Sequence, residues 1–224
     1  MTNRHDAAAP ATGLLSKSVQ LDGTTIPYAV FVPHDFDPAN TWPLIVFLHG
    51  RGERGKDGVL QTKVGLYPAV QKNPERFPCL VLMPQCPIDR MWASGFDIID
   101  ATLDRTLSEY PIDRNRIYLT GLSMGGYGAW LYGAERDGTF AALLPICGGG
   151  KVSDAPRLAK TPIWAFHGAA DALVNPEASR AMVEAVKQAG GTIQYTEYPG
   201  VAHNAWDLTY SNPEVIAWLL AQHK

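Results

Sequence analysis

The sequence predicts an α/β fold in which helices cover both faces of a mostly parallel central sheet. Three observations support this prediction. A hairpin signal opens the chain, apolar strand-type segments then alternate with helical segments, and chemically capable polar residues follow the ends of several strands. In open α/β sheets the ligand site lies at the carboxyl ends of the strands. A functional site is therefore expected at that edge.

The expected strands follow from local composition. Residues 14–20 and 25–32 alternate in polarity on either side of Asp22-Gly23, which predicts an antiparallel hairpin. Continuous apolar runs are typical of parallel strands that are buried on both faces. The remaining expected strands, in chain order, are residues 43–48, 79–83, 116–120, 140–147, 162–166 and 192–198.

The expected helices lie between these strands. Phe96, Ile99, Leu103 and Leu107 recur with a helical period, and Gly190-Gly191 is a typical stop after an amphipathic segment. The expected helices, in chain order, are residues 65–72, 96–110, 126–132, 176–188 and 213–222. Glycine- and proline-rich loops are expected at 51–64 and 85–95.

Composition excludes several classes of protein. Hydrophobic residues make up 46% and charged residues 18% of the chain, as in globular proteins. The net charge is -3 without a basic block, which argues against nucleic acid as a partner. No segment reaches the roughly 18 apolar residues of a membrane helix, so no membrane partner is expected. We expect residues 1–13 to form a frayed tail without a signal peptide, and residues 14–224 to form one domain.

The cysteines suggest a compartment. Cys79, Cys86 and Cys147 are an odd number at irregular spacing. That pattern favours reduced thiols in a cytoplasmic protein. The sequence also allows a disulfide bond between Cys79 and Cys86.

The motif Gly121-Leu122-Ser123-Met124-Gly125 stands between a strand-type segment and a helical one. A sharp strand-turn-helix connection needs small residues around the serine, and glycine tolerates such crowded backbone. The serine hydroxyl is then held above the sheet at a helix N-terminus, where negative charge is stabilised. Ser123 is therefore the candidate nucleophile.

A serine nucleophile needs a base, and the base needs a group that orients it. Asp171 and His203 follow the last two strands in the chain order Ser, Asp, His. Asp154 and Asp207 are rival carboxylates, and Asp171 is alternatively a turn residue. Asp154 lacks the strand-end position, and Asp207 follows His203 too closely to face it from another strand.

Two further histidines, His49 and His167, also end strands. We interpret both as structural, with their rings bonded to loop backbone. A zinc site made of these two and His203 would lack any ligand-pair spacing, so neither a metal nor a cofactor is expected.

Charge that develops on the substrate oxygen needs two backbone N–H donors. One is expected from Met124, the residue after the nucleophile. The other is expected from Arg51, in the loop that follows residues 43–48. A plain glycine turn is the alternative interpretation of that loop.

With these motifs in place, residues 14–222 resemble serine esterases of the α/β-hydrolase fold. They are most similar to small carboxylesterases related to dienelactone hydrolase, to the phospholipase/carboxylesterase group and to prolyl-oligopeptidase catalytic domains. Residues 48–53 resemble the oxyanion loop of that group. Residues 83–87, with Trp92, resemble a segment of feruloyl- or polyester-depolymerase-like esterases. The resemblance implies cleavage of carboxylic esters through an acyl-enzyme.

Substrate preference is the least specified property. Only residues 148–161 separate two strands where related folds insert a lid, so no cap domain is expected. An open site suits short acyl esters or the exposed ester of a larger, polymer-linked molecule. Trp92 and Trp206 are candidate aromatic walls, with burial in the core as the equal alternative for each. Peptidase or amidase activity and non-catalytic binding are the alternative functions, and the oligomeric state stays open.

Overall fold

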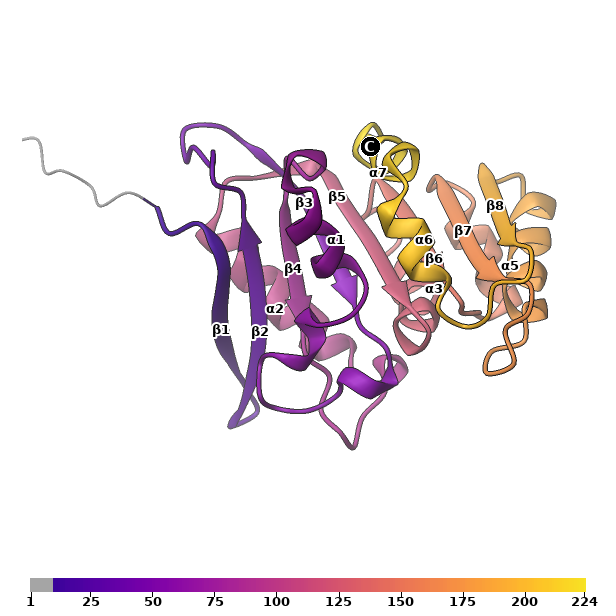
Figure 1. Cartoon of the computed structure of the whole chain (residues 1–224), viewed down its shortest axis with the longest axis horizontal. Helices are drawn as coiled ribbons and strands as arrows, with labels where there is room; N and C mark the ends of the chain where they lie inside the picture. The colour runs from indigo at the N-terminus through magenta and orange to yellow at the C-terminus, as the bar shows by residue number, and fades with distance from the viewer. Residues whose placement is uncertain (1–9) are drawn as a thin grey trace, which may run out of the picture.

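Eight strands form one mixed sheet in the computed structural model, which describes residues 10–224 (Figure 1). The order across the sheet is β1-β2-β4-β3-β5-β6-β7-β8. The strands are β1 (Gly13–Leu21), β2 (Thr24–Val32), β3 (Trp42–Leu48), β4 (Leu80–Pro84), β5 (Ile112–Leu122), β6 (Ala142–Ile146), β7 (Ile163–Gly168) and β8 (Ile193–Tyr198).

The strand pairing confirms the expected sheet, which is mostly parallel with an N-terminal antiparallel hairpin. The strands β1 and β2 form an antiparallel hairpin, and β2 is antiparallel to β4. From β4 to β8 every neighbouring pair is parallel, so these strands end at the same edge. The expected tail lies outside the described residues as far as residue 9, and β1 already begins at Gly13.

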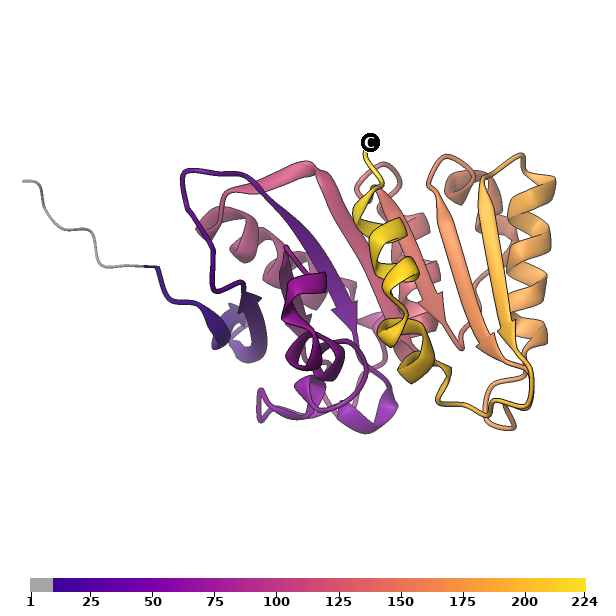
Figure 2. The same ribbon diagram turned by 45° about the horizontal axis from the view of Figure 1, so that its top comes forward.

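Helices cover both faces of the sheet, as expected (Figure 2). One face packs against α2 (Phe96–Glu109), α3 (Met124–Glu135), α4 (Ala155–Leu158) and α5 (Glu177–Gln188). The other face packs against α1 (Leu66–Lys72), α6 (Ala205–Ser211) and α7 (Pro213–Leu220). Alternate residues of one strand enter different layers: in β3, Val46 belongs to the first core and Phe47 to the second. Helices therefore bury both faces of the central strands, which explains the continuous apolar runs in their sequences.

Two helices were not expected from the sequence. Helix α4 has four residues and α6 has seven, which is too short for a helical period to be recognised. Helix α6 matters for the site because it begins two residues after His203 and turns the chain back onto the sheet. Tyr210 on α6 is buried, and its hydroxyl lies 2.8 Å from the Thr120 hydroxyl of β5.

No cap domain lies between β6 and β7. The connection holds a 3-10 turn (Val152–Asp154) and the short helix α4. The three cysteines are buried and free, so Cys79 and Cys86 are not bridged. Within residues 10–224, each helix is too short or too polar to cross a bilayer.

Candidate active site

Ser123 occupies the turn between β5 and α3. Its φ is 54°, a left-handed conformation that is uncommon for a residue with a side chain. Its N–H donates to the carbonyl oxygen of Ile146 at 2.9 Å, which ties the turn to β6. A Cβ on Gly121 would clash with the backbone of Gly125, and a Cβ on Gly125 would clash with the carbonyl oxygen of Leu48. The two glycines of the motif are therefore required by backbone contact.

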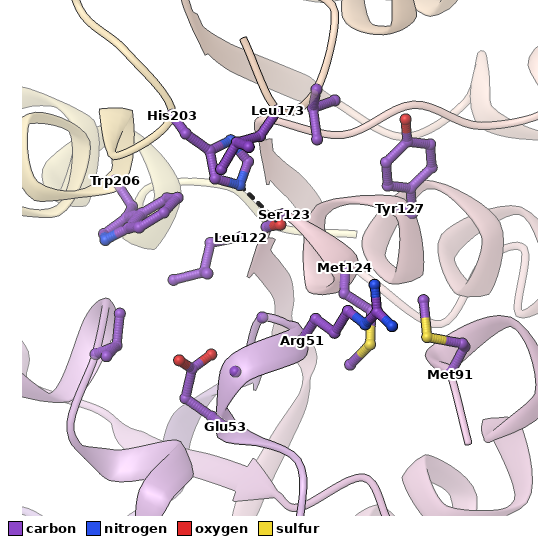
Figure 3. A pocket seen from close by; sticks show the side chains of 14 residues that line it. Arg51, Glu53, Met91, Leu122, Ser123, Met124, Tyr127, Leu173, His203 and Trp206 are labelled. Carbon is purple, nitrogen blue, oxygen red and sulfur yellow. Dashed lines mark hydrogen bonds between the residues drawn. The ribbon is translucent and has the colours of Figure 1, made fainter. Parts of the chain in front are cut away.

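The structure brings Ser123, His203 and Asp171 together from three different connections. Nε2 of His203 lies 2.9 Å from Oγ of Ser123 (Figure 3). Nδ1 of the same ring lies 2.6 Å from Oδ2 of Asp171. The Asp171 side chain is fully buried, whereas 16% of the His203 side chain is exposed. The imidazole thus links a buried carboxylate to a hydroxyl that faces the pocket.

Asp171 is held in the ionised form by its donors. Burial alone would raise the pKa of Asp171, but hydrogen bonds from the Val174 N–H, from His203 and from the Leu173 N–H lower it overall. Both backbone bonds, at 2.9 Å, end on Oδ1, which leaves Oδ2 for the histidine. The neighbouring imidazole is therefore oriented by a charged partner.

The rival carboxylates lie elsewhere. Asp154 ends the 3-10 turn after β6. Asp207 is an exposed residue of α6, and its Oδ2 accepts a hydrogen bond from the Asn204 side chain at 3.3 Å. Among the described residues, Asp171 is the carboxylate that contacts His203.

His49 bonds loop backbone, as expected. Its ring is buried, its Nδ1 donates to the Gly50 carbonyl oxygen at 2.6 Å, and its Nε2 accepts from the Cys86 N–H at 2.9 Å. Burial lowers the pKa of His49 to about 4. The neutral ring therefore connects the loop after β3 to the loop after β4.

His167 also bonds loop backbone, since its Nε2 lies 3.0 Å from the carbonyl oxygen of Val174. In addition, Nε2 lies 3.2 Å from Oδ2 of Asp171, a contact that the sequence did not suggest. In the described part of the chain, Cys147, His167 and Asp171 are the group whose side-chain atoms lie close enough to bind one metal ion. Each of these side chains already has protein partners: the Cys147 thiol bonds the His203 carbonyl oxygen, both His167 nitrogens are bound, and both Asp171 oxygens accept hydrogen bonds. This donor set does not suit a metal.

The two expected backbone donors flank Ser123. Met124 is the first residue of α3, and Arg51 is the first residue of a 3-10 turn, Arg51–Glu53. The N–H of a first helical residue has no acceptor within its own helix. Both residues line the pocket, and a Cβ added to the neighbouring Gly50 would lie 3.7 Å from the Cβ of Ser123.

A pocket of about 500 Å³ opens above Ser123. Figure 3 shows His203, Leu173 and Trp206 on one side of the serine and Arg51, Met124 and Met91 on the other. Trp206 packs edge-on against the His203 ring, with centroids 5.2 Å apart, and lines the pocket. Its contact with substrate stays a prediction. The apolar wall residues are Val64, Met91, Leu122, Met124, Tyr127, Leu173, Val174 and Trp206.

Trp92 does not line this pocket, and its assignment as an aromatic wall is corrected. The side chain is fully buried in the core that contains α2 and α3. Its Nε1–H donates to the carbonyl oxygen of His49 at 2.9 Å, and the two rings pack edge-on. Indole is large and apolar with one donor, so a buried acceptor suits it better than an open cleft. Trp92 therefore supports the His49 loop from behind.

Several wall residues were missed by the sequence analysis. Met91 and Leu173 stand in loops, Tyr127 stands on α3, and Glu53 follows Arg51 in the 3-10 turn. Burial raises the pKa of Glu53 above its ordinary range. No sequence signal marks these residues, because loop side chains reach the pocket only through the paths of their loops.

The sheet, the strand-end site and the missing cap define an α/β-hydrolase. The model of the Dienelactone hydrolase family matches residues 88–208, and the chain belongs to that family. Carboxylesterase SOBER1 from Arabidopsis thaliana is 27% identical over 71% of this chain and 82% of its own length. A probable feruloyl esterase C from Aspergillus niger is 28% identical over 66% of this chain and 57% of its own length.

A solved thermostable esterase has the same fold. It superposes with a TM-score of 0.87 at 39% identity, over 94% of this chain and 63% of that chain. The present chain therefore spans less than two thirds of that esterase and of the feruloyl esterase relative. The relatives are a carboxylesterase, a probable feruloyl esterase and a solved esterase, in agreement with the carboxylic ester hydrolase that the sequence predicted.

Proposed function

We propose that the chain hydrolyses carboxylic esters of short or exposed acyl groups through an acyl-enzyme on Ser123. The observation that carries this proposal is the continuous pair of hydrogen bonds from Ser123 Oγ to His203 and from His203 to Asp171, at 2.9 and 2.6 Å. A non-catalytic protein on this fold would not need such a chain of contacts. No cofactor or metal takes part in the proposed reaction.

In the first half-reaction, Ser123 Oγ attacks the ester carbonyl while His203 Nε2 accepts the hydroxyl proton. The resulting oxyanion accepts hydrogen bonds from the backbone N–H groups of Arg51 and Met124. His203 then returns the proton to the leaving alkoxide, and the alcohol departs. Asp171 stabilises the imidazolium that exists between these two proton transfers.

In the second half-reaction, water replaces the alcohol. His203 takes a proton from the water, whose oxygen attacks the acyl carbon of the Ser123 ester. Collapse of this intermediate releases the carboxylic acid, and the proton returns to Ser123 Oγ. The 16% exposure of the His203 side chain supports this step, because water reaches the ring directly.

The shape of the pocket supports short or exposed acyl groups. The connection between β6 and β7 holds only a 3-10 turn and the four-residue helix α4. Among the wall residues, Leu173 is 79% and Met91 is 43% exposed, so the wall is shallow. The relative named as a probable feruloyl esterase supports an ester that is exposed on a larger molecule.

Labelling with a fluorophosphonate tests the proposal. We expect one adduct per chain, located on Ser123 by mass spectrometry of the digested protein. Ser123→Ala should lose the label and ester turnover with its fold intact. Ser108→Ala is the matched control, because Ser108 is an exposed residue of α2 whose hydroxyl bonds only the Arg105 carbonyl oxygen. Turnover by purified Ser123→Ala, or a label on another serine, would refute the assignment.

Peptide p-nitroanilides separate an esterase from a peptidase. Amide cleavage needs stronger protonation of the leaving amine and tighter alignment than ester cleavage. We expect these substrates, including prolyl anilides, to be nearly inert. Rapid prolyl-anilide cleavage would move the chain to the peptidase alternative.

A further inference from the structure

We infer that His167 is a positioning residue, which holds the Asp171 carboxylate in the orientation that His203 requires. The inference rests on the proposed function, because it adds a fourth side chain to the Ser123, His203 and Asp171 arrangement. The observation behind it is the buried contact of 3.2 Å between His167 Nε2 and Asp171 Oδ2.

The neighbours of His167 determine its tautomer. Its side chain is fully buried at the end of β7, four residues before Asp171. Nε2 faces the Val174 carbonyl oxygen at 3.0 Å and the ionised Asp171 carboxylate at 3.2 Å. Both partners accept hydrogen bonds and cannot donate. The proton must therefore lie on Nε2, where the N–H bonds the Val174 carbonyl oxygen and lies close to the carboxylate.

The opposite nitrogen is bound as well. Nδ1 lies 2.7 Å from the Ser179 hydroxyl oxygen on α5, which also lies 2.7 Å from the Gly148 carbonyl oxygen. Burial lowers the pKa of His167, so the ring is neutral with its proton on Nε2. The single proton of the Ser179 hydroxyl then has two acceptors within reach, His167 Nδ1 and the Gly148 carbonyl oxygen. With both nitrogens bound, the ring cannot rotate. His167 thus holds a fixed N–H group beside the Asp171 carboxylate.

This donor completes the set around the carboxylate. Oδ1 of Asp171 accepts from the backbone N–H groups of Leu173 and Val174, and Oδ2 accepts from His203. Nε2 of His167 lies 3.2 Å from the same Oδ2. Val174 takes part twice, since its N–H bonds Asp171 and its carbonyl oxygen bonds His167. Leu173 and Val174 line the pocket. His167 therefore positions both the Asp171 carboxylate and this part of the pocket wall.

Other titratable groups around the pair do not explain a change in its titration. Cys147, after β6, places its thiol 3.2 Å from the His203 carbonyl oxygen, and its raised pKa keeps it neutral. Glu197 on β8 acts on His167 through its charge, but it is paired with Arg180 at 2.6 Å. Ser123 and Trp206, the other neighbours of the His203 ring, carry no charge. A shift in the acid limb of activity would therefore report the donors on Asp171.

The pH profile of kcat/KM tests the inference in two variants of residue 167. His167→Gln and His167→Asn introduce amide side chains that differ in length by one methylene group. The side chain of His167→Gln reaches the position of Nε2 and keeps a donor to Asp171. That of His167→Asn reaches only the position of Nδ1, so it keeps a partner for Ser179 and loses the donor. Without that donor the Asp171 charge is shared less and attracts the His203 proton more strongly.

For His167→Asn we expect kcat/KM to fall by roughly tenfold, the usual effect of one hydrogen bond to a charged group. Its acid limb should move to higher pH by about half a unit or more. His167→Gln should restore the wild-type limb. Thr102→Val, which removes a buried hydroxyl bonded only within α2, is the control for general destabilisation and should leave the limb in place.

Proton NMR supplies a second readout that does not need turnover. The resonance of the proton between His203 and Asp171 should move downfield in His167→Asn and stay near its wild-type position in His167→Gln. If neither variant shifts the acid limb of kcat/KM or the proton resonance, the inference is overturned and the role of His167 is purely structural. Activity that survives Ser123→Ala would instead refute the proposed function, whatever the His167 variants do.

Discussion

The pH dependence of stability offers a sharp test of the packing behind the site. His49 is buried, and its two nitrogens are bound to Gly50 and Cys86. Protonation of Nε2 would turn an acceptor into a second donor that faces the Cys86 N–H. Burial lowers the pKa of His49 from its ordinary 6.5 to about 4. His49 therefore binds a proton less readily in the folded chain than in the unfolded chain.

The sign of the effect follows from proton binding. Between about pH 6.5 and 4 the unfolded state binds more protons at residue 49 than the folded state, so stability falls as pH falls. A shift of this size is equivalent to about 3 kcal/mol once the pH is below both values. Between pH 7 and pH 5 the contribution is about 2 kcal/mol, a large fraction of a typical total of 5 to 15.

Urea unfolding at pH 7, 6 and 5 measures this slope, and His49→Gln isolates it. Glutamine does not titrate, and its amide oxygen can still accept the Cys86 N–H. His167, whose pKa is also lowered by burial, is unchanged in the variant. We expect the variant to be less stable at pH 7 but to lose about 2 kcal/mol less on going to pH 5. Parallel slopes for the two proteins would show that His49 is not the titrating group.

Three further predictions concern the pocket and the packing behind it. Arg51→Pro should lose most of kcat, because proline removes a backbone donor worth ~3 kcal/mol, and Gly50 is extended (φ -76°, ψ -177°), as the residue before proline should be. Arg51→Ala should keep most of kcat on a small neutral ester, and equal collapse of both variants would implicate the guanidinium instead. Trp92→Phe should lose about 1–3 kcal/mol of unfolding free energy by leaving the His49 carbonyl oxygen unpaired; a changed KM with unchanged stability would return Trp92 to the substrate wall. For p-nitrophenyl esters from acetate to palmitate, kcat/KM should peak at the short end, since each methylene left unburied forgoes ~0.8 kcal/mol; a peak at long chains with interfacial activation would contradict the open pocket.

Local patterns determined much of the fold. The hairpin follows from alternation around Asp22-Gly23, and the buried strands follow from continuous apolar runs that need cover on both faces. The turn at Ser123 follows from Gly121 and Gly125, which stand two residues before and two residues after the serine. These features depend on residues that are close in the sequence, so they can be read along the chain.

The candidate site residues were predicted from their positions just after the ends of strands. Ser123, Asp171 and His203 each follow a strand, and parallel strands end at one edge. Which carboxylate meets the histidine was an expectation that depended on chain order. Only the packed structure places Asp171, rather than Asp154 or Asp207, at 2.6 Å from the His203 ring.

The tertiary structure alone decided the direction of side chains that have no local pattern. Trp92 and Trp206 were equivalent candidates in the sequence, yet one is buried behind His49 and the other packs against His203 in the pocket. The contact of His167 with Asp171 was likewise unforeseen, because it depends on how the loop 169–176 turns back over the end of β7. Such contacts are set by distances between segments remote in sequence, and those distances exist only after the strands have paired and the helices have packed.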